Sequence, residues 1–124
     1  MHSLRRIFFI EDDPDLAAVL NEYLVHLGYN VCGSAANIQD AVAGIQNSKP
    51  QLVLVDLMIK GTLGGITIGD YLASKTDIPF IYITAHDRAE VLKEARQTMP
   101  DGFLLKPFDE RQLRAAIEMA QRVG

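Results

Sequence analysis

The chain has 124 residues, which fits one domain with a single sizeable core. Apolar residues make up 48% and charged residues 23%, and the formal net charge of −4 argues against a nucleic-acid-binding surface. Cys32 is the only cysteine, which excludes a disulfide within the chain, and no apolar run is long enough for a membrane span or a signal-peptide core. We therefore expect one cytoplasmic domain over residues 1–124.

Short apolar runs recur along the chain between turn-forming residues, and they predict five β-strands. The runs cover residues 7–10, 30–35, 52–55, 78–83 and 102–105. Residues 30–35 are the weaker run, whereas the others are continuously apolar, which is typical of strands buried on both faces of a parallel sheet.

Each predicted strand is followed by a stretch with helical spacing, bounded by capping residues or by Gly and Pro. The expected helices run from Asp13–Pro14 to Gly28, from Asn37 to before Pro50, from about Ile66 to Ser74, from Asp87 to about Met99, and onward from Asp109. Asp87 with Glu90 three residues later resembles a capping box.

Five β–α units in succession predict an α/β fold with helices on both faces of a parallel sheet. Right-handed crossovers restrict the topology to a doubly wound sheet. With five strands, we expect the flavodoxin-like order 2-1-3-4-5 and five helices.

Four of the predicted strands end on chemically active residues. Glu11 and Asp12 follow the first strand, Asp56 the third, Thr84 the fourth and Lys106 the fifth. Taken singly, each residue could cap a helix, end a strand in a turn or carry a solvated charge. Because ligands of such sheets bind at the carboxyl ends of the strands, the joint pattern predicts one pocket.

Three crowded carboxylates repel one another unless a cation is bound, and Mg²⁺ favours such oxygen ligands. Lys106 would add a second positive charge. The arrangement suits phosphoryl transfer, in which a carboxylate can be the acceptor and a threonine hydroxyl can donate to a phosphate oxygen.

These residues lie in segments that resemble the receiver domains of two-component response regulators, including the chemotaxis regulators, over essentially the whole chain. The matching segments are Ile7-Phe8-Phe9-Ile10-Glu11-Asp12-Asp13, Leu52-Val53-Leu54-Val55-Asp56-Leu57, Ile83-Thr84-Ala85 and Leu105-Lys106-Pro107-Phe108. Each segment is weak by itself, whereas all four in this order and with receiver-like separations are specific.

The resemblance implies that Asp56 accepts the phosphoryl group and that Mg²⁺ is the cofactor. Asp12 would bind the metal directly, Glu11 would act largely through water, and the backbone carbonyl of Met58 would be a further ligand. The separation from Asp56 favours Glu11-Asp12 as the acidic pair and leaves Asp13 as the helix cap.

The resemblance also implies that Thr84 follows the phosphoryl group on activation and that Lys106 pairs with it. The Lys106–Pro107 peptide bond is expected to be cis. Phe103 stands where the family has its aromatic switch, although it could be a plain strand residue. Tyr82 is expected to serve in packing.

Met58 and His86 occupy positions that tune dephosphorylation in receivers, and an exposed loop histidine is the alternative for His86. The loop of residues 57–65 lacks the Pro-Gly of many regulators and looks like receivers that are attached to sensor kinases or found alone.

The leading hypothesis is a switch that takes a phosphoryl group from a histidine kinase or a phosphotransfer protein. Phosphorylation would shift a two-state equilibrium in the face of the fourth helix, fifth strand and fifth helix, through which a homodimer could also form. Such a module catalyses only its own phosphorylation and dephosphorylation, and it needs no nucleic acid or membrane contact.

Three alternatives remain. A metal-dependent phosphohydrolase with an aspartyl-phosphate intermediate commonly has a second acid where this chain has Met58. A flavin-binding carrier should have a hydroxyl-rich phosphate loop, where this chain has Glu11-Asp12-Asp13. A binding-only receiver is disfavoured by the complete set of acids, threonine and lysine.

Overall fold

The computed structural model describes residues 5–85 and 88–120, and these residues form a five-stranded parallel sheet in the order β2-β1-β3-β4-β5. The strands are β1 (Arg6–Ile10), β2 (Asn30–Ala35), β3 (Leu52–Asp56), β4 (Phe80–Thr84) and β5 (Gly102–Leu105). The predicted flavodoxin-like strand order is confirmed.

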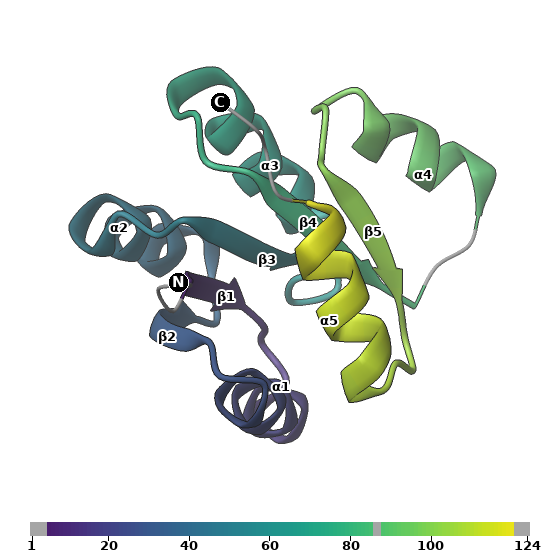
Figure 1. Ribbon diagram of the computed structural model, residues 1–124. Helices are drawn as coiled ribbons and strands as arrows, with labels where there is room; N and C mark the ends of the chain where they lie inside the picture. Colours follow the sequence, from purple (N-terminus) through teal and green to yellow (C-terminus); the bar gives the residue numbers. More distant parts are fainter. Residues whose placement is uncertain (1–4, 86–87, 121–124) are drawn as a thin grey trace.

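Five helices of the described residues cover the two faces of the sheet (Figure 1). They are α1 (Pro14–His26), α2 (Ile38–Ser48), α3 (Gly64–Lys75), α4 (Ala89–Arg96) and α5 (Glu110–Met119). The helices α1 and α5 pack on one face, and α2, α3 and α4 pack on the other. The doubly wound α/β architecture is therefore as predicted.

The central strand β3 shows why continuous apolar runs were the right signal. Val53 and Val55 enter the layer under α2, α3 and α4, while Leu52 and Leu54 enter the layer under α1 and α5. Alternate side chains of a strand point to opposite faces, so a strand covered on both sides must be apolar throughout. Each such buried side chain contributes roughly 1.5–3 kcal/mol.

Capping residues fix several helix ends where the sequence predicted them. The Asp13 side chain accepts hydrogen bonds from the first turn of α1, and Gly28, with φ of 90°, follows the end of that helix. Asn37 caps α2 through the amide of Asp40. Asp109 caps α5 in a reciprocal capping box with Gln112.

The helix α3 begins at Gly64, two residues before the predicted start at Ile66. The chain turns into α3 directly against the end of β3. A Cβ atom at Gly65 would lie 2.2 Å from the carbonyl oxygen of Asp56, so glycine is required here by packing. The two glycines therefore belong to the helix, and assigning them to the loop was wrong.

The helix α4 is shorter than predicted. Its N-cap is Arg88, which makes no side-chain capping bond, and the predicted capping residue Asp87 lies outside the described residues. Glu90 forms an ion pair with Arg88, with 3.4 Å between nitrogen and oxygen. The helix ends at Arg96, and Met99 has a left-handed φ of 60°, which takes the chain out of the helix. The strand β4 begins at Phe80, two residues after the predicted start at Ile78.

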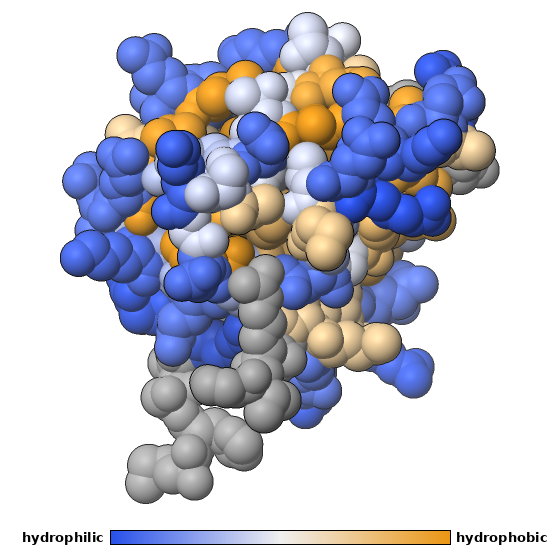
Figure 2. Space-filling view, turned by 90° about the horizontal axis from the view of Figure 1, so that it is seen from above, coloured by the Kyte–Doolittle hydropathy of each residue, from blue (hydrophilic) through white to orange (hydrophobic). Residues whose placement is uncertain are grey.

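On the face seen in Figure 2, hydrophobic residues show between hydrophilic ones. Five large hydrophobic residues are exposed among those described: Val19, Val25, Met99, Leu105 and Met119. Within the described parts of the chain, every helix is too short or too polar to cross a membrane.

Candidate functional site

Three carboxylates meet at the carboxyl ends of β1 and β3. These strands are neighbours in register, with Ile10 opposite Val55, so Glu11, Asp12 and Asp56 emerge side by side. One carboxylate oxygen from each lies within 4.8 Å of the others. Glu11 and Asp56 are buried, whereas Asp12 is partly exposed. The structure therefore brings the predicted acidic residues together.

Lys106 joins this cluster from the end of β5. Its Nζ lies 3.1 Å from Oδ2 of Asp56 and 3.3 Å from Oε1 of Glu11. The Lys106 amide donates to the Thr84 carbonyl at 2.9 Å, which extends the pairing between β4 and β5 as far as the site. The peptide bond between Lys106 and Pro107 is cis. Thr84 is buried at the end of β4.

Backbone amides orient two of the carboxylates. The Met58 amide donates to Oδ1 of Asp56 at 3.3 Å. The Lys60 amide donates to Oδ2 of Asp12 at 2.8 Å, across the space between two loops. These two hydrogen bonds fix the orientation of the Asp56 and Asp12 side chains.

The Lys60 amide is presented by a tight two-residue turn. Ile59 and Thr62 exchange backbone hydrogen bonds of 2.8 and 3.1 Å, and Lys60 and Gly61 have left-handed φ values of 52° and 76°. Positive φ at both central residues is the signature of a type I′ turn. Proline cannot adopt this backbone conformation, so the missing Pro-Gly noted in the sequence has a structural counterpart here.

The electrostatics of the pocket favour a further cation. Burial, together with a hydrogen bond and repulsion from Asp56, raises the pKa of Glu11 to about 7, and the Asp13 amide and Lys106 oppose this only partly. Burial lowers the pKa of Lys106, but its hydrogen bonds and attraction to Asp56 and Glu11 outweigh the burial and leave the pKa raised. One lysine thus leaves the carboxylates incompletely neutralised.

The donor set fits Mg²⁺. Three hard carboxylate oxygens converge, one of the three residues is open to solvent, and Mg²⁺ prefers a few carboxylates together with water. The Met58 carbonyl as a further ligand remains a prediction.

The two predicted switch residues, Thr84 and Phe103, lie on the adjacent strands β4 and β5. Thr84 is buried and Phe103 is half-buried. The Phe103 ring packs against Tyr82 with centroids 5.7 Å apart, and the Arg96 guanidinium lies 5.9 Å from its centroid. A switching role for Thr84 and Phe103 remains a prediction. His86 lies outside the described residues.

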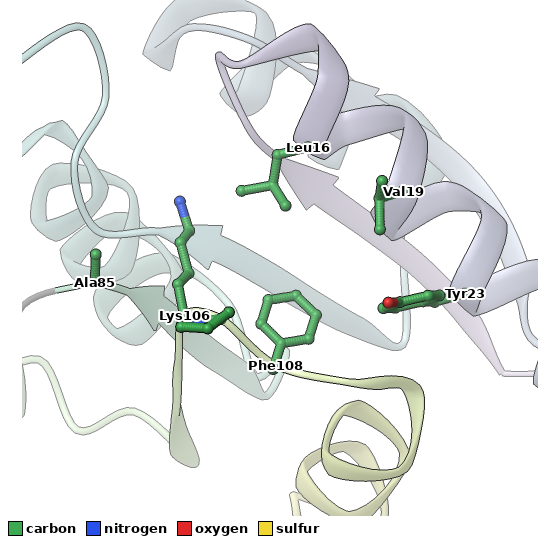
Figure 3. Close-up of a pocket in the computed structure, with 7 residues that line it drawn as sticks. Leu16, Val19, Tyr23, Ala85, Lys106 and Phe108 are labelled. Carbon is green, nitrogen blue, oxygen red and sulfur yellow. The ribbon is translucent and has the colours of Figure 1, made fainter.

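A surface groove of about 380 Å³ borders the acidic pocket (Figure 3). Its walls come from α1 and from the segment between β5 and α5. The residues that line it are Leu16, Val19, Tyr23, Ala85, Lys106, Pro107 and Phe108. The sequence indicated an apolar face of the first helix but gave no sign that part of that face stays uncovered. Only the packing of α1 beside the loop before α5 creates this groove.

Comparison with known proteins shows which family the chain resembles. Residues 7–118 match the family model of the response regulator receiver domain. The transcriptional regulatory protein PdtaR of Mycobacterium tuberculosis is 33% identical over 94% of this chain, and the regulatory protein LuxO of Vibrio vulnificus is 31% identical over 91%. The chain spans 56% of the length of PdtaR and 25% of that of LuxO.

Solved structures give the same result. The signal receiver domain of a modulated diguanylate cyclase from Desulfovibrio desulfuricans is 35% identical, has a TM-score of 0.87, and is matched over 95% of this chain and 94% of its own. A CheY-like receiver domain protein from Methanospirillum hungatei has a TM-score of 0.84 at 24% identity, which shows a shared fold.

Proposed function

Since this chain belongs to the family of response regulator receiver domains, we propose that residues 1–124 act as one phospho-accepting switch with Asp56 as the acceptor. The family is a signalling family and not a catalytic one. The observation that carries the proposal is the buried Asp56 carboxylate, which lies within 4.8 Å of two further acids and 3.1 Å from the lysine amine.

In the proposed reaction, a carboxylate oxygen of Asp56 attacks the phosphorus of a phosphohistidine on a histidine kinase or a phosphotransfer protein. The new O–P bond forms as the P–N bond breaks, and the imidazole leaves. Lys106 lies where it can offset the charge of the incoming phosphoryl oxygens. Phosphoryl transfer depends mainly on such positioning and charge stabilisation.

Glu11, Asp12, Asp56 and the Met58 carbonyl would hold Mg²⁺, which supplies charge neutralisation for the phosphoryl group. The Lys60 amide keeps the Asp12 carboxylate in place for this role. Met58 and His86, two residues after Asp56 and Thr84 in the sequence, would tune the rate of hydrolysis.

The groove beside the pocket supports a protein donor. It is lined almost wholly by apolar side chains and includes the stem of Lys106, whose amine contacts Asp56. An apolar helix from the donor would fit against α1 and Phe108 while its phosphohistidine reaches Asp56.

The proposed output is a shift in the face formed by α4, β5 and α5. Thr84 would donate its hydroxyl to a phosphoryl oxygen, and Phe103 would respond to its movement. Leu105 on β5 and Met119 on α5 are exposed hydrophobic residues of these elements, which supports a protein contact there, a second copy of the chain included.

Intact mass after incubation with acetyl phosphate tests the proposal. We expect one phosphoryl group to be added with Mg²⁺, none with chelator, and none in Asp56→Asn. Addition that persists in Asp56→Asn would show that the acceptor is a different residue. Sustained release of phosphate from a small phosphomonoester, at many turnovers per chain, would instead favour the phosphohydrolase.

A further inference from the structure

The tyrosine of β4 has a polar partner at the end of α4. Tyr82 is completely buried, and its hydroxyl oxygen lies 2.6 Å from Oγ1 of Thr98, just beyond the last residue of α4. A buried hydroxyl is costly unless it is hydrogen-bonded, so this contact is the condition under which a tyrosine can occupy the core. Burial raises the pKa of Tyr82 to about 12, which keeps the hydroxyl a proton donor.

The direction of the bond follows from the second contact of Thr98. Its hydroxyl donates to the Ala95 carbonyl at 2.6 Å, which uses its single proton. The Tyr82 hydroxyl must therefore donate to Thr98. The result is a chain from the Tyr82 hydroxyl through the Thr98 hydroxyl to a backbone carbonyl of α4, and such chains strengthen each member.

The two ends of α4 are held differently. The helix has eight residues, of which Val91 and Ala95 are buried, and its N-cap residue Arg88 makes no side-chain capping bond among the described residues. At the C-terminal end, the Thr98 amide bonds back to Ala95 at 3.1 Å, and the Met99 amide to Arg96 at 2.9 Å. These bonds close the last turn of the helix, and the bond from Tyr82 joins that turn to the sheet.

Neighbouring residues leave room for the Tyr82 side chain or pack against it. A Cβ atom at Gly69 of α3 would lie 1.8 Å from the Tyr82 hydroxyl oxygen, so glycine makes room for that group. On the other side, the Phe103 ring packs on Tyr82, and Arg96 of α4 lies over the same ring. Phe103 therefore contacts both the strand and the helix that the hydrogen bond connects.

We propose that the Tyr82–Thr98 hydrogen bond is a pivot: it holds the C-terminal end of α4 to β4, so that switching reorients the N-terminal end of the helix. The motion rests on the proposed function, whereas the anchoring does not. Tyr82 is thus a positioning residue for the output face, beyond the packing role that the sequence indicated.

Hydrogen exchange of the whole chain, followed by mass spectrometry, tests the pivot with and without acetyl phosphate and Mg²⁺. In the wild type, phosphorylation should leave the exchange rate of peptides ending at residues 95–99 unchanged. It should change the exchange rate of peptides from the start of α4. In Tyr82→Phe, exchange at residues 95–99 should be roughly fivefold faster even without phosphodonor, and the phosphorylation-dependent change should extend over the whole helix.

Three further variants separate the pivot from general stability. Thr98→Val should behave like Tyr82→Phe, Thr98→Ser should retain wild-type protection, and Tyr71→Phe, which removes a hydroxyl from a half-buried tyrosine of α3, should change nothing at residues 95–99. Equal acceleration of exchange in β3 and α4 of Tyr82→Phe, or no change in either, would overturn the pivot. Failure of Asp56 to be phosphorylated, read from the mass of the same samples, would overturn the proposed function and leave the anchoring test intact.

Discussion

Glu11 shows how strongly one residue can depend on its surroundings. It is buried beside Asp56, and its pKa is raised from 4.5 to about 7. The folded chain therefore binds this proton more tightly than the unfolded chain does. The contribution of Glu11 to stability is fully present below pH 4.5 and is lost as the pH rises through about 7.

Glu11→Gln should remove this pH dependence. We expect the free energy of unfolding of the metal-free wild type to fall relative to that of the variant between pH 4.5 and pH 8, by on the order of 2 kcal/mol. Urea unfolding in chelator at several pH values measures this difference. A constant difference across the range would show that Glu11 titrates normally in the folded chain.

Gly65 is a second residue with a strict requirement. Gly65→Ala should destabilise the chain by about 2 kcal/mol or more, because the new methyl group would meet the backbone of Asp56 and Leu57. Gly102→Ala is the matched control, since the nearest atom to its new methyl group is 3.9 Å away. Urea unfolding checks both, and equal stability of the two variants would contradict the packing argument.

At the scale of elements, the loop between β3 and α3 supplies more than a connection. Its type I′ turn directs the Lys60 amide at Asp12, which links the conformation of one loop to a carboxylate of another. Lys60 and Asp12 are far apart in the sequence. The turn thus helps to set the geometry of the proposed metal site.

Lys60→Pro should weaken Mg²⁺ binding by roughly tenfold, since it removes the amide hydrogen bond and cannot adopt the positive φ of the turn. Lys60→Asn is the control, because asparagine tolerates this backbone region and keeps the amide. Calorimetric titration with Mg²⁺ measures both affinities. Equal affinities in the two variants would exclude a positioning role for the amide.

At the scale of the whole molecule, the proposed metal site depends on the alignment of two adjacent strands of the sheet. Its carboxylates lie at the ends of β1 and β3, and the side chains of these two strands enter both core layers. Ligand binding to such a site stabilises the entire folded chain, because the unfolded chain does not present it.

Mg²⁺ should therefore raise the free energy of unfolding by about 1.4 kcal/mol when its concentration is ten times the dissociation constant. Asp12→Asn should lose most of this gain while it folds normally, since Asp12 is partly exposed. Thermal unfolding at pH 8, with and without Mg²⁺, provides the measurement. A similar gain in the variant would place the metal elsewhere.

Much of the fold could be predicted from the sequence, because the strands and most helix ends depend on local chemistry. The apolar runs marked the strands, and Asp13, Asn37 and Asp109 marked helix starts through hydrogen bonds to the next turn. The start of α3 was misjudged, because Gly65 is there for a contact with β3 that is distant from any local signal. The end of α4 was misjudged because a left-handed residue at Met99 is set by the path into β5.

The sequence by itself determined the strand order and the convergence of Glu11, Asp12, Asp56 and Lys106, since parallel strands place their carboxyl ends at one edge of the sheet. Only the tertiary structure decided which polar atoms pair: the Lys60 amide with Asp12, and the Tyr82 hydroxyl with Thr98. It also decided that part of α1 lines an open groove. Patterns of hydrophobicity fix which face is buried, whereas hydrogen-bond partners and grooves depend on distances between elements that are far apart in the chain.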